Sequence, residues 1–62
     1  MIFNDSDKLF LVYNEDYLSI EKLAKILKCK GHEIIKEYDK MLSTGEYYMY
    51  QAEKFRIRKI RV

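Results

Sequence analysis

Residues 17–40 constrain the fold of this chain more than any other stretch. Ser19 can begin a helix by accepting a hydrogen bond from a free backbone N–H, and Glu21 suits the positive end of that helix. Apolar residues then recur at spacings of three and four on one face of each of two segments, namely Leu23, Ala24 and Leu27 in the first and Ile34, Tyr38 and Met41 in the second. The pattern predicts two short helices whose apolar faces pack together.

We expect the first helix to run from about Ile20 to Leu27 and the second from about His32 to Leu42. Gly45 can take the left-handed conformation that closes the second helix. The small side chain of Ala24 would let the two helices cross closely. This is the layout of a helix-turn-helix unit, whose second helix often enters a DNA groove.

The segment before this pair is ambiguous. Residues 7–13 contain Leu9-Phe-Leu-Val-Tyr13, which is rich in β-formers and favours a strand. Asp5 and Ser6 offer helix caps, and these with the polar exit at residues 14–16 favour a short helix. The local pattern leaves both alternatives open.

The C-terminal third predicts a β-hairpin. Residues 47–50 and 54–62 are rich in aromatic and β-branched side chains, and residues 51–53 form the predicted turn, although they lack the Gly or Asn that a tight hairpin prefers. The apolar phase also changes along the second strand, which a bulge near Arg58-Lys59 would explain. The expected fold class is α+β, with a short N-terminal element, two helices and a hairpin in one domain over residues 1–62.

The charges of this 62-residue chain are unevenly distributed around a net charge of +2. Residues 1–16 sum to −3, whereas residues 47–62 sum to +4. A basic C-terminus suits an acidic partner such as a phosphate backbone. A solvated edge strand protected from aggregation by its Lys and Arg side chains would explain the same charges.

The single cysteine excludes an internal disulfide framework and indicates a reducing compartment. No apolar run reaches the roughly 20 residues that a bilayer span needs, and no signal peptide is recognisable. We therefore predict a cytoplasmic protein with no membrane association. Because so short a chain buries a small core, a second copy of the chain is one way to complete it.

The order of elements resembles a winged helix-turn-helix domain of the kind found in bacterial and phage regulators. The resemblance is carried by Asn14-Glu-Asp-Tyr-Leu-Ser-Ile-Glu-Lys-Leu-Ala24, by Met41-Leu-Ser-Thr-Gly-Glu-Tyr47 and by the predicted terminal hairpin, over roughly residues 8–60. Where the turn of that family usually carries glycine, a β-branched residue and serine, this chain has Lys28, Cys29 and Lys30. The resemblance implies double-stranded DNA as the partner, with homodimers on two-fold sites.

The candidate DNA contacts form two groups. The turn and the second helix supply Lys28, Lys30, His32, Lys36 and Lys40, and the last strand supplies Lys54, Arg56 and Arg58, which alternate with apolar residues and would share one strand face. Ile35 could contact a thymine methyl or complete the core. A solvated helix with neighbouring opposite charges is the alternative for the first group. Acidic Glu33, Glu37 and Asp39 on the second helix oppose an approach to phosphates.

Other chemistry has little support. Tyr47, Tyr48 and Tyr50 suit packing in the core or a dimer better than stacking on bases. Cys29 and His32 have a C-x-x-H spacing, but two ligands do not close a zinc site, so we predict no metal and no cofactor. The chain has one histidine, and we identify neither a Ser-His-acid set nor a glycine-rich phosphate loop. We predict a protein that is not an enzyme.

Two functions follow from these observations. The first is a small transcriptional regulator that binds double-stranded DNA with its second helix toward the major groove and its basic hairpin on phosphates. The second is a protein–protein interaction module, such as a phage-encoded inhibitor or adaptor, which uses the acidic second helix as the surface for a host protein.

Overall fold

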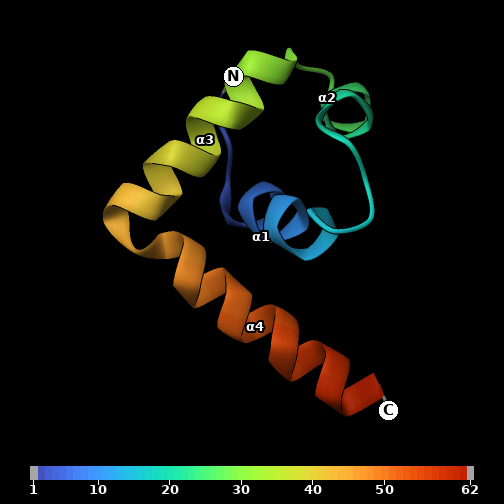
Figure 1. Ribbon diagram of the computed structural model, residues 1–62, viewed down its shortest axis with the longest axis vertical. Coiled ribbons are helices and arrows are strands. Elements are labelled where there is room, and N and C mark those ends of the chain that lie inside the picture. The colour runs from blue at the N-terminus through green and yellow to red at the C-terminus, as the bar shows by residue number, and fades with distance from the viewer. Residues whose placement is uncertain (1, 62) are drawn as a thin grey trace.

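The computed structural model describes residues 2–61, with side chains as far as Ile57, and all its regular structure is helical. Helix α1 spans Asp5–Asn14, α2 spans Ile20–Leu27, α3 spans Gly31–Thr44 and α4 spans Glu46–Arg61. Helices α2 and α3 pack on each other, and α4 packs on both α1 and α3 (Figure 1).

The two helices predicted for the middle of the chain are confirmed. Helix α2 has the predicted bounds, and the Ser19 hydroxyl accepts a hydrogen bond of 3.2 Å from the backbone N–H of Lys22. Helix α3 is slightly longer than predicted, and Gly45 closes it with a φ of 85°. All six residues of the two predicted apolar faces belong to the core or pack against it: Leu23, Ala24, Leu27, Ile34, Tyr38 and Met41.

The predicted α+β fold with a C-terminal hairpin is wrong, because residues 46–61 form one helix and no described residue lies in a strand. One face of α4 is buried or half-buried and recurs at spacings of one and three: Tyr47, Tyr50, Gln51, Lys54 and Ile57. That helical period explains why the expected turn lacks Gly or Asn and why the strand changed phase. Val62, the end of the expected strand, lies outside the described residues.

Residues 7–13 belong to a helix, which settles the ambiguity at the N-terminus. Its cap is Asn4 rather than Asp5 or Ser6. The side chain of Asn4 accepts a hydrogen bond of 2.8 Å from the N–H of Asp7, and the carboxylate of Asp7 accepts one of 3.2 Å from the N–H of Asn4. This reciprocal capping outweighs the β propensity of the segment.

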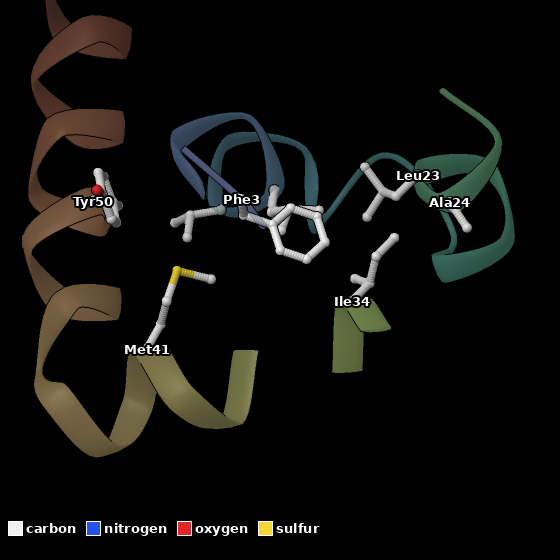
Figure 2. Close-up of a cluster of buried hydrophobic side chains, with 8 residues drawn as sticks. Phe3, Leu23, Ala24, Ile34, Met41 and Tyr50 are labelled. Carbon is white, nitrogen blue, oxygen red and sulfur yellow. The ribbon is translucent and has the colours of Figure 1, made fainter. Parts of the chain in front are cut away.

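Phe3 lies at the middle of the core, ahead of the first helix. Figure 2 shows its ring between Leu23 and Ile34 on one side and Met41 and Tyr50 on the other. Leu11 and Val12 of α1 are fully buried beside it. Burial of each such side chain stabilises a fold by about 1.5–3 kcal/mol, so all four helices are tied to one centre.

Candidate nucleic-acid interface

The surface of the α2–α3 unit is basic. Its six lysines are exposed, and none forms an ion pair with another residue in the described part of the chain: Lys22, Lys25, Lys28, Lys30, Lys36 and Lys40. Among the described residues of this unit, the exposed carboxylates are those of Glu21 and Asp39. The unit therefore presents more exposed positive than negative charge.

The turn places two of the predicted residues at the beginning of α3. Lys28 takes the left-handed conformation, with φ 57° and ψ 47°, and the N–H of Cys29 donates a 2.9 Å hydrogen bond to the carbonyl of Ala24. This bond satisfies a carbonyl that the end of α2 would leave free. Lys28 and Lys30 are thus exposed beside the N-terminus of α3, where the helix dipole adds positive potential.

Three more predicted residues are brought together along α3. His32, Lys36 and Lys40 are exposed, follow each other at intervals of four residues, and line a groove of about 310 Å³. The other residues that line this groove are Phe3, Glu33 and Glu37. All five predicted residues of the turn and α3 are exposed, and three of them share this groove.

Two of the three acidic residues on α3 line the same groove but have partners within the chain. The Glu33 carboxylate accepts a 2.8 Å hydrogen bond from the N–H of Lys30, and this bond lowers the pKa of Glu33 to about 2. Glu37 is buried, with Oε2 4.0 Å from the ammonium of Lys8 and without a hydrogen-bond partner among the described residues. Asp39 is the exposed acid of α3, so the outward face is less acidic than its sequence suggests.

Lys54 does not share this surface. Its side chain is 2% exposed, and its ammonium donates hydrogen bonds of 2.9 Å to Asp16 and 3.2 Å to the carbonyl of Val12. Glu15 lies 3.7 Å from the same ammonium. The prediction that Lys54, Arg56 and Arg58 share one strand face is therefore wrong. Lys54 instead joins α4 to the end of α1 and the following loop.

The remaining predicted cations also belong to α4. Arg56 is exposed and pairs with Glu53, with 2.6 Å between its Nη2 and the Glu53 Oε2. The side chain of Arg58 lies outside the described residues. On a helix, residues two apart point in different directions, so Lys54 and Arg56 cannot line one face as they would on a strand.

The structure also places two residues for which the sequence left more than one role open. Ile35 is 52% exposed on α3, and Tyr50 is buried in the core. Lys22 and Lys25, which were not predicted as contacts, are exposed on α2. The sequence could have predicted this exposure, because the helical period places both lysines opposite Leu23 and Ala24.

Residues 2–61 contain neither a cluster of metal ligands nor a membrane-spanning helix. No three His, Cys, Asp or Glu side chains lie close enough there to hold a metal ion, and Cys29 is half-buried, which raises the pKa of its thiol. None of the helices in this range combines the length and apolar character that crossing a membrane requires.

Comparison of the chain with protein-family models, with curated proteins and with solved structures gives no match in any of the three. The functional argument therefore depends on the chemistry of the α2–α3 surface itself.

Proposed function

We propose that this chain binds double-stranded DNA as a small helix-turn-helix regulator, with α3 toward the major groove. The observation that carries the proposal is the set of six exposed lysines on α2, the turn and α3 that lack ion-pair partners within residues 2–61. Unneutralised cations on a rigid helical unit can replace the counterions of a phosphate backbone.

The outward face of α3 offers groups suited to base edges. Lys36 and Lys40 can donate to guanine O6 and N7 or to phosphates, and Asp39 can accept from the amino group of cytosine. Ile35 can contact a thymine methyl. Because Glu33 bonds the N–H of Lys30 and Glu37 lies near the ammonium of Lys8, the repulsion expected from an acidic α3 is reduced.

The phosphate contacts in this proposal come from α2 and the turn instead of a hairpin. Lys28 and Lys30 flank the N-terminus of α3, and Lys22 and Lys25 extend the basic surface along α2. Helix α4 packs on α1 and α3 and contributes Lys54 to the fold, so Lys54 has no role in DNA contact. The resemblance of residues 14–24 to bacterial and phage regulators supports a role in transcription in the cytoplasm.

The proposal is tested by fluorescence anisotropy of a labelled random-sequence duplex. If about six phosphates are neutralised, affinity should fall roughly 10³-fold between about 50 and 200 mM salt. Lys36→Gln should weaken binding and reduce the slope of log K against log salt by about 0.9. The Lys36→Glu, Lys40→Glu double variant should abolish binding.

The matched control is Ser6→Glu, which changes the net charge by the same amount as Lys36→Gln. Ser6 is exposed on α1, outside the proposed DNA-binding surface. Equal losses in the two single variants would indicate a nonspecific charge effect and contradict the proposal. Absence of duplex binding at low salt would also contradict it and would favour the protein-interaction alternative. A positive result leads to selection of bound sequences from a random pool.

A further inference from the structure

Helix α3 carries a polar stripe that points away from the core. At 100° per residue, the buried positions Ile34, Glu37 and Met41 define the inward direction. The residues nearest the opposite direction recur at spacings of four, three and four, and all are exposed: His32, Lys36, Asp39 and Ser43. In Figure 1 the other three helices lie on one side of α3, so this stripe is open to a partner.

Asp39 is the acid of this stripe, and the fold does not use its charge. Its carboxylate forms neither an ion pair nor a hydrogen bond with any described residue, whereas Glu33 and Glu37 have partners within the chain. A free carboxylate among lysines repels phosphates, so Asp39 lowers the affinity for duplexes of every sequence alike. A contact with something other than phosphate gives such a group a role in binding.

A carboxylate only accepts hydrogen bonds, which restricts the base edges that Asp39 can contact. In the major groove, the donors are the amino groups of cytosine and adenine. The adenine amino group stands beside the N7 acceptor, whose lone pair repels a carboxylate. The cytosine amino group has no acceptor beside it on the major-groove edge of its own base. Asp39 therefore favours cytosine.

Lys36 supplies the complementary group for the same base pair. It lies three residues before Asp39, so the two Cβ atoms are about 5–6 Å apart, and no ion pair joins these two described side chains. The guanine that pairs with cytosine presents its O6 and N7 acceptors to the same groove. We propose that Lys36 and Asp39 together read one C·G base pair, with Lys36 donating to guanine and Asp39 accepting from cytosine.

This inference rests on the proposed function and adds the base pair that the surface selects. It also gives position 39 a definite effect on sequence preference. An amide at this position would accept and donate at once, which matches N7 and the amino group of adenine. Asp39→Asn should therefore change the preferred base at one position of the binding site from cytosine to adenine. Because Asn has nearly the same size and shape as Asp, the variant should keep its helical circular dichroism.

Selection of bound duplexes from a random pool tests the inference with the full chain. The wild-type sequences should share a C·G pair at a position where Asp39→Asn selects A·T. The matched control is Glu21→Gln, which removes the same charge from an exposed carboxylate of α2 and leaves α3 unchanged. It should select the wild-type sequences. A preference that is unchanged in Asp39→Asn, or altered equally in Glu21→Gln, would overturn the inference.

Fluorescence anisotropy with the selected duplex then tests the two contacts separately. N4-methylcytosine lacks the N–H that faces the major groove, so it should weaken wild-type binding about five- to tenfold and leave Asp39→Asn nearly unaffected. In the same way, 7-deazaguanine lacks N7 and should weaken the wild type but not Lys36→Met, which keeps the stem without the ammonium.

The outcomes separate this inference from the proposed function. Salt-dependent duplex binding without an enriched C·G pair, or equal effects of the modified bases on wild type and variants, would overturn the reading of the base pair alone. Absence of any duplex binding at low salt would overturn both.

Discussion

Two groups of lysines in this molecule have opposite surroundings. Lys8 and Lys54 lie between helices, each within ion-pair distance of two carboxylates. Lys8 donates a 3.1 Å hydrogen bond to Glu46, and this bond holds the pKa of that carboxyl below its ordinary value. Lys36 and Lys40 are exposed on α3 and form no ion pair with any described residue.

The difference shows that a charge on this chain is available to a partner only where the fold leaves it unneutralised. The acidic residues 1–16 and the basic residues 47–62 look like separate binding regions in the sequence. In the structure, part of each neutralises the other through the pairing of Lys54 with Glu15 and Asp16. The less basic middle of the chain holds the free lysines. Substitution of Lys8 or Lys54 should thus change the stability of the fold, and substitution of the exposed α2–α3 lysines should change DNA affinity.

Substitution of Lys54 should produce the largest effect. Lys54→Ala removes a buried ion pair and the packed stem of the side chain, and we expect a loss of about 2–3 kcal/mol in the free energy of unfolding. Lys54→Met keeps the stem and should lose only about 1 kcal/mol. Urea unfolding followed by circular dichroism measures both values. Folded Lys54→Met should bind duplex DNA with unchanged affinity, and a loss of affinity there would place Lys54 in the binding surface.

Alkaline pH should weaken the same junction. The hydroxyl of Tyr47 donates to both carboxylate oxygens of Glu15, at 2.7 and 2.8 Å, and burial together with this bond raises the pKa of Tyr47 to about 12. Burial also raises the pKa of Tyr38, whose hydroxyl donates to the carbonyl of Leu11.

Since the folded state favours the protonated phenols, their contribution is present below pH 10 and is lost as pH rises toward about 12. The free energy of unfolding should therefore decline across that window, as urea titrations at successive pH values would show. Tyr47→Phe should reduce the decline, although it lowers stability at neutral pH. A decline of equal size in that variant would exclude Tyr47 as a cause.

The α2–α3 unit was predictable because several local signals agree there. The Ser19 cap, the apolar spacing and the glycine at position 45 all favour the same two helices. Helix α4 was not predictable in this way, because its core-facing positions include the polar residues Gln51 and Lys54. A polar residue at a buried position interrupts the apolar period, and the remaining aromatic and β-branched side chains then resemble strands.

The candidate surface was predicted in part for a related reason. Lys28, Lys30 and Lys36 are exposed as expected, since they lie opposite the apolar stripes or in the turn. The sequence could not show that Glu37 turns toward Lys8, because that contact joins residues 29 positions apart on different helices. Long-range pairing of this kind requires the fold to be known.

Lys28 provides a smaller test, because it is a proposed binding residue in a strained turn. A left-handed lysine costs about 1–2 kcal/mol, so Lys28→Gly should raise the free energy of unfolding by about 0.5–1 kcal/mol after the entropy of glycine is included. Duplex affinity should fall about two- to threefold with the loss of one phosphate contact. The comparison variant is Gly45→Ala, at a φ of +85°, which should destabilise by about 1 kcal/mol without changing affinity. Stabilisation together with unchanged affinity in Lys28→Gly would remove Lys28 from the interface.

The smallest expected effect distinguishes the acids of α3. Asp39 is exposed among the lysines, so Asp39→Asn removes a charge that repels phosphates and should tighten binding to the random-sequence duplex by about threefold. Glu37 is buried and faces Lys8, so Glu37→Gln should leave the affinity of the folded protein unchanged while lowering its stability. Anisotropy titrations at low salt resolve a threefold change. If Glu37→Gln tightened binding as much as Asp39→Asn, the side chain of Glu37 would have to face the DNA, and the assignment of the outward face of α3 would be wrong.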